Sequence, residues 1–142
     1  MLGPDVSSCL PGLHAFTGCD SVSAFAGKGK LAALKLLRKF FNFQEAFASM
    51  GKQHDLSPNL FEDLESFSCL VYVSKTIKDV NQLRYAMFCA KQGKIESYQL
   101  PPCRDSLKNH VRRANYQCLI WKQCLLQFQV IAELKHHGRI RG

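Results

Sequence analysis

The sequence predicts an all-α fold built as one small domain. Apolar residues recur at the three- and four-residue spacing of buried helix faces in several segments. Helix-start and helix-stop residues, such as Ser57-Pro58 and Gly93, separate those segments. The chain has 142 residues, 46% of them hydrophobic, which is enough for one domain to bury a core without disulfides or metals.

The N-terminal third predicts two helices after an irregular start. Because Pro and Gly gather in the first ~15 residues, we expect an irregular lead-in there, merging into a short apolar segment at Leu13–Phe16 that ends at Gly18. Residues 31–41 have their apolar positions on one helical face. A second short helix is expected from Phe43 to Met50, where Gly51 ends it.

The remainder predicts three further helices. Ser57 is a typical N-cap with Pro58 at the first helical position, and the helical period continues to about Val71. Residues 70–73 could equally form a short strand. Asp79 is expected to cap a helix reaching Lys91, and the longest helix, about 104–128, follows Pro101-Pro102.

The predicted organisation is therefore a single helical domain over residues 1–125. Residues 13–41 form a helix-hairpin-helix-like segment within it, and residues 57–125 form the helical remainder. Residues 126–142 end in Lys135-His-His-Gly-Arg-Ile-Arg-Gly142 and are expected to be a basic, poorly ordered tail.

Charge and cysteine usage narrow the partners and the compartment. The formal net charge is +8, which favours an anionic partner such as nucleic acid, although solubility alone would also explain it. The seven cysteines include no CxxC pair, and no secretory segment precedes them, so we expect reduced, mostly buried thiols. No apolar run is long enough to cross a bilayer. The expected location is intracellular, in the nucleus or cytoplasm, with no membrane partner.

The segment Ala26-Gly27-Lys28-Gly29-Lys30 is the first candidate site. Glycines two residues apart allow a tight turn and let backbone N–H groups approach a phosphate, while the positive end of the next helix points at the same place. Lys28, Lys30 and, further along the helix, Arg38 add positive charge. A plain turn between two helices would explain the glycines about as well.

Asp20 is the second candidate, as one ligand of a divalent metal. Two-metal phosphodiester hydrolysis needs several clustered carboxylates, and only Asp5 precedes Asp20. Asp20 could instead cap the following turn through its own side chain. The acids at 62, 63 and 65 are interpreted as a solvated helix start. Catalysis by this chain alone is therefore not expected.

The third candidate is Arg112-Arg113-Ala-Asn-Tyr116 with Trp121. Basic residues beside aromatic ones can bind single strands by charge and stacking. Trp121, however, lies on the apolar line of its helix, so core packing is the favoured interpretation.

Two motifs together resemble a known family. Gly18-Cys19-Asp20, followed by Phe25, Gly27, Gly29, Ala33 and Leu36, is similar to the helix-hairpin-helix segment of flap endonuclease (XPG-like, PIN-like) nucleases. From about Leu10 to Leu125 the chain also resembles a set of animal proteins with this nuclease-like core, for which an origin in mobile elements is one interpretation. They share its Leu100-Pro-Pro102, His110, Arg113-Ala-Asn-Tyr116 and Trp121-Lys122.

The resemblance implies several expectations. Asp20 would belong to the Mg²⁺-binding carboxylate cluster, and the hairpin 26–30 would hold the backbone of duplex or branched DNA, with K⁺ bound to its carbonyls. The parallel-sheet core that carries the other carboxylates has no counterpart here. The chain is therefore expected to be the C-terminal part of such a fold, binding DNA but catalytically incomplete. A non-binding helical interaction domain, or a nuclease completed by a missing N-terminal segment, are the alternatives.

Overall fold

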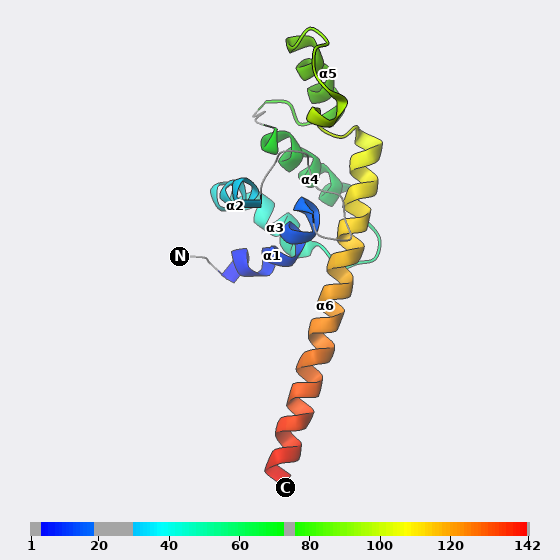
Figure 1. Ribbon diagram of the computed structural model, residues 1–142. Coiled ribbons are helices and arrows are strands. Elements are labelled where there is room, and N and C mark those ends of the chain that lie inside the picture. The colour runs from blue at the N-terminus through cyan, green and yellow to red at the C-terminus, as the bar shows by residue number, and fades with distance from the viewer. Residues whose placement is uncertain (1–3, 19–29, 73–75, 142) are drawn as a thin grey trace.

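The computed structural model describes residues 4–18, 30–72 and 76–141. In these ranges the protein consists of helices joined by turns and loops, with no strand (Figure 1). The all-α prediction is confirmed. The elements are α1 (Pro4–Thr17), α2 (Lys30–Lys39), α3 (Phe41–Ser49), α4 (Pro58–Val71), α5 (Val80–Ala90), the 3₁₀ turn η1 (Ser97–Gln99) and α6 (Arg104–Arg141).

Helix α1 corrects the expectation of an irregular lead-in. Pro4 occupies its first turn, where proline costs little, and Pro11 lies inside the helix. Tertiary packing overrides the local signal, because α1 lies against α3 with Cys9, Leu13 and Phe16 buried. Gly12 makes that approach possible, since a Cβ atom there would come within 2.6 Å of the Phe47 carbonyl oxygen.

The central helices begin where their capping residues predict. The Ser57 hydroxyl accepts a hydrogen bond from the Leu60 N–H at 3.2 Å, and the Asp79 carboxylate accepts from the Asn81 N–H at 2.8 Å. The strand interpretation of residues 70–73 is wrong as far as Tyr72: α4 is helical to Val71 and Tyr72 is its C-cap. Residue 73 lies outside the described ranges.

Four phenylalanines form the centre of the core, where α1, α3 and α4 meet. Phe67 on α4 contacts the rings of Phe16, Phe43 and Phe47 at centroid distances of 5.9, 5.3 and 4.8 Å, each edge to face. Edge-to-face pairs add roughly 0.5–1.5 kcal/mol each beyond area burial. Phe67 therefore joins three helices through one fully buried side chain.

Helix α6 runs along the whole bundle and then leaves it (Figure 1). Its buried stripe is Leu107, Val111, Ala114 and Cys118. Lys122 then donates to the carbonyls of Ala48 and Met50 at the end of α3, where the helix dipole favours a cation.

The predicted end of this helix near residue 128 is corrected: α6 is helical to Arg141, through most of the segment 126–142 that was expected to be a tail. No Gly or Pro occurs between Trp121 and His137, and leucine, glutamine and alanine there favour helix. Even so, none of the described helices, α6 included, combines the length and apolarity that crossing a bilayer requires.

Candidate nucleic-acid interface

Of the predicted hairpin, the structure describes only the flanking residues, up to Gly18 on one side and from Lys30 on the other. Asp20, Ala26, Gly27, Lys28 and Gly29 lie outside the described residues, and the Lys30 backbone begins α2. On the other side α1 ends at Thr17, and Gly18 follows with φ of +113°, in the region that favours glycine. The positive φ at position 18 therefore explains why glycine occurs there.

The end of α1 is held firmly against α6. The His110 ring Nε2 lies 2.6 Å from the Phe16 carbonyl oxygen, and since a carbonyl only accepts, Nε2 must carry the proton. Burial lowers the pKa of His110, so the neutral ring is favoured. The Thr17 hydroxyl also donates to the Leu13 carbonyl at 2.7 Å. These contacts fix the position of Phe16 and Thr17 at the end of α1.

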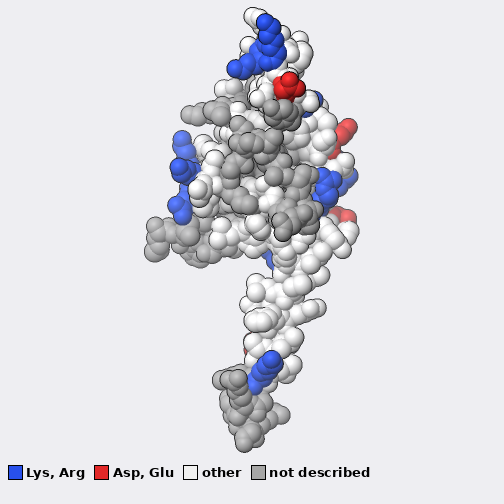
Figure 2. Space-filling view, viewed as in Figure 1, with Lys and Arg blue, Asp and Glu red and all other residues white. Residues whose placement is uncertain are grey.

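Helix α2 presents a cationic face on the far side of that segment. Lys35, Arg38 and Lys39 are exposed at i, i+3 and i+4, whereas Ala33 and Leu37 are buried. Figure 2 shows Lys and Arg side chains stacked along the edge of the molecule where α2 lies in Figure 1. The predicted binding residue Arg38 therefore belongs to an exposed basic face.

The sequence around this face is strongly one-sided in charge. Between Ser21 and Gln44 the chain carries no acid and five cations: Lys28, Lys30, Lys35, Arg38 and Lys39. The Lys39 ammonium lies 5.5 Å from the Phe40 ring centroid, and the next residue, Phe41, is 68% exposed. Charge beside exposed aromatic surface suits a phosphate backbone with adjacent bases.

The described residues do not form a metal centre: among them no group of three or more His, Cys, Asp or Glu side chains could hold an ion. The Mg²⁺ expected at Asp20 and the K⁺ expected at 26–30 concern residues outside the described ranges. Both ions therefore stay predictions from the sequence.

The acids of α4 divide into two kinds. Glu62 and Asp63 are exposed, as expected, and partial burial together with Glu62 and Glu45 raises the pKa of Asp63. The interpretation of Glu65 as solvated is wrong. Glu65 is buried, accepts the Val80 N–H at 3.1 Å and lies 3.8 Å from the Arg104 Nε. It joins α4 to the starts of α5 and α6.

The Arg112–Tyr116 segment is partly exposed and partly buried. Arg112, Arg113 and Tyr116 are exposed. Asn115 is buried: its Oδ1 accepts the Gly51 N–H at 2.8 Å and its Nδ2 donates to the Gln53 carbonyl at 2.9 Å. Asn115 therefore fixes the loop between α3 and α4 and is not available to a ligand.

Trp121 is half-buried and packs against the core, which was the favoured interpretation. Its ring stacks on His14 with centroids 5.3 Å apart. Phe16 meets His110 in the same interface, at 5.5 Å. His14 and Phe16 of α1 thus meet His110 and Trp121 of α6 where the two helices cross, and these residues have a structural role.

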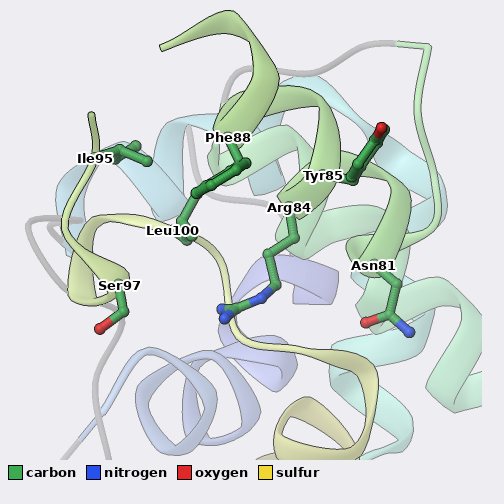
Figure 3. A pocket seen from close by; sticks show the side chains of 7 residues that line it. All are labelled: Asn81, Arg84, Tyr85, Phe88, Ile95, Ser97 and Leu100. Atoms are coloured by element: carbon green, nitrogen blue, oxygen red, sulfur yellow. The ribbon is translucent and has the colours of Figure 1, made fainter. Parts of the chain in front are cut away.

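One pocket was not predicted from the sequence. It lies between α5 and the segment after it, with a volume of about 450 Å³ (Figure 3). Among the described residues of the lining, Arg84 is the one cationic residue, and its guanidinium donates a hydrogen bond to the Pro101 carbonyl at 2.9 Å. Two aromatic residues of the pocket, Tyr85 and Phe88, are exposed on α5. Its lining is Asn81, Arg84, Tyr85, Phe88, Ile95, Ser97 and Leu100.

Comparison of the chain with protein-family models, with curated proteins and with solved structures gave no match. The resemblance to flap endonucleases accordingly stays a prediction.

Proposed function

We propose that this protein binds the phosphate backbone of DNA, duplex or branched, through the segment 26–30 and the cationic face of α2. The observation that carries the proposal is the continuity of the two: Lys35, Arg38 and Lys39 are exposed on the helix that begins at Lys30. The positive end of that helix adds to the attraction for a phosphate.

The dimensions of the face suit a nucleic-acid strand. Ten helical residues span about 15 Å, the axial length over which one DNA strand presents about four phosphates. If the five cations between 28 and 39 engage four phosphates, log affinity should fall with log salt at a slope of roughly −3.6.

We propose binding and not hydrolysis, because two-metal cleavage needs several clustered carboxylates and the part of the chain that the structure describes contains no such cluster. A nuclease completed by a further segment would show Mg²⁺-dependent cleavage that Asp20→Ala abolishes.

The test is fluorescence anisotropy of a labelled duplex and a labelled flap substrate titrated with the full chain. Lys35→Glu/Arg38→Glu and Lys28→Glu/Lys30→Glu should each weaken binding at least tenfold and flatten the salt dependence. The control is Lys91→Glu/Lys94→Glu, which changes net charge equally at exposed positions after α5.

Equal losses in the control would mean that only net charge matters, and unchanged affinity in both test variants would overturn the proposal. The absence of any binding at low salt would instead favour a helical interaction domain.

A further inference from the structure

The second half of α6 carries more exposed apolar surface than a solitary helix should. Each of six large apolar side chains on this part of α6 is between 52% and 70% exposed. They are Leu125, Leu126, Phe128, Val130, Ile131 and Leu134. At ~200 Å² for a fully exposed residue of this size, these six together with Leu10 of α1 expose on the order of 800 Å².

Part of this surface, Leu125 and Phe128, continues the buried stripe of the same helix. Leu107, Val111, Ala114 and Cys118 are fully buried in the bundle at alternating spacings of four and three. Trp121, Leu125, Phe128 and Ala132 extend that spacing without a break. Inside the bundle the stripe packs on α1 and α4, whereas beyond Trp121 no described element covers it (Figure 1).

The charge of the segment disfavours an anionic partner. From Gln123 to Leu134 the only charged residue is Glu133, in a chain of net charge +8. Figure 2 shows the projecting part of α6 as largely uncharged surface, with blue atoms only just above the grey end. A helix lying on a lipid surface would carry a Lys- and Arg-rich polar face, and here the polar residues are mainly glutamines.

The base of the projecting helix offers a matching recess. A pocket of about 510 Å³, mostly apolar, lies where α1 meets α6. Leu10, Pro11 and His14 form one side, and Trp121, Lys122 and Leu125 form the other. One or two aliphatic side chains from another helix would fit in it.

We propose that a second copy of this chain covers the surface, with the projecting halves of the two α6 helices packed antiparallel. The twofold axis would lie near residues 126–128, so that Ile131 and Leu134 of each chain reach the recess beside Trp121 of the other. The end of each helix then lies between the α6 and the α1 of its partner, which explains why apolar residues occur on all of its sides. The exposed area of about 800 Å² per chain equals the contribution of one partner to a standard stable interface.

The experiment measures mass and fluorescence of the full chain. Light scattering after size exclusion, at tens of micromolar, should give twice the chain mass of 16.1 kDa. Trp121 is the only tryptophan and lies in the recess, so its emission should shift to the red as dilution dissociates the dimer.

Ile131→Glu/Leu134→Glu should give a monomer with the red-shifted emission and an unchanged helix content, because both side chains are exposed in the single chain. The matched control is Tyr85→Glu/Phe88→Glu, which changes exposed apolar residues on α5 and should leave the dimer intact.

A monomeric wild-type chain overturns the proposal, including the case in which that monomer binds phosphatidylcholine–phosphatidylserine vesicles. A dimer whose tryptophan emission ignores both dilution and the double substitution overturns the antiparallel arrangement. The outcome is independent of DNA binding, because neither set of substitutions touches α2.

Discussion

Replacing Asn115 by alanine should destabilise the protein by about 2–4 kcal/mol. The side chain makes two short hydrogen bonds, from the Gly51 N–H at 2.8 Å and to the Gln53 carbonyl at 2.9 Å, and a longer one to the His54 carbonyl at 3.4 Å. Gly51 is buried, so its N–H would lose its partner where water does not reach, at a cost of roughly 1–3 kcal/mol. The loss of the second bond and of packing contributes about 1 kcal/mol more.

The loop cannot easily relax to repair this loss. Gly51 has φ of +80°, and its Cα lies so close to α6 that an added Cβ would meet the Cys118 carbonyl carbon at 2.8 Å. The N–H therefore stays directed at the position that Asn115 vacates. Without the side chain, the loop between α3 and α4 loses its polar links to α6 at Gly51, Gln53 and His54, and keeps those that Cys118 and Lys122 make to the Met50 carbonyl.

The assay is urea unfolding followed by far-ultraviolet circular dichroism. Using the Ile131→Glu/Leu134→Glu background removes any contribution from association. Arg112→Ala, an exposed change on the same helix, is the control and should cost less than about 0.5 kcal/mol. If Asn115→Ala and Arg112→Ala were equally stable, the hydrogen bonds of Asn115 would not hold the loop.

Three further predictions follow from burial. Because burial lowers the pKa of His110, the unfolded chain binds the imidazole proton more tightly than the folded chain does. Stability should be full above about pH 6.5 and should fall as the pH drops from there through the lower folded pKa, by up to ~1.4 kcal/mol per pH unit. His110→Gln should flatten that slope in pH-dependent unfolding, and an identical slope would contradict the assignment. Burial, then Glu65 and Asp79, raises the pKa of Cys69 to about 12. Brief alkylation at pH 8 followed by peptide mass spectrometry should therefore label exposed Cys89 and spare Cys69, and equal labelling would show that the site opens. Phe67→Ala should cost about 3–5 kcal/mol in the same unfolding assay, and a loss under 1 kcal/mol would mean that the core refills around it.

The sequence predicted the helices whose N-terminal ends are capped by side chains close to them in the chain. Ser57 and Asp79 cap through bonds within three residues, so no distant part of the fold is needed to identify them. Helix α1 was missed because its stability comes from packing Cys9, Leu13 and Phe16 against α3, which is a long-range effect. The extension of α6 was missed because the basic ending suggested a tail.

The sequence predicted which kinds of residue belong to the candidate site better than it predicted how those residues are arranged in space. The sequence identified Arg38 as a surface cation, but the grouping of Lys35 and Lys39 with it depends on which face of α2 is buried. The interpretation of Glu65 failed for a similar reason. Its burial is imposed by the start of α5, fifteen residues further along the chain, which no local pattern reveals.

Because α6 is one unbroken helix from the bundle to Arg141, the projecting half has a fixed rotational phase relative to the bundle. A single residue inserted after Trp121 would turn every later side chain by about 100° and advance it by about 1.5 Å. An insertion of seven residues would return the apolar positions to within about 20° of their original direction. The length of this helix can therefore change in steps of seven residues, but not of one, without changing the direction in which each of its apolar side chains points relative to the bundle.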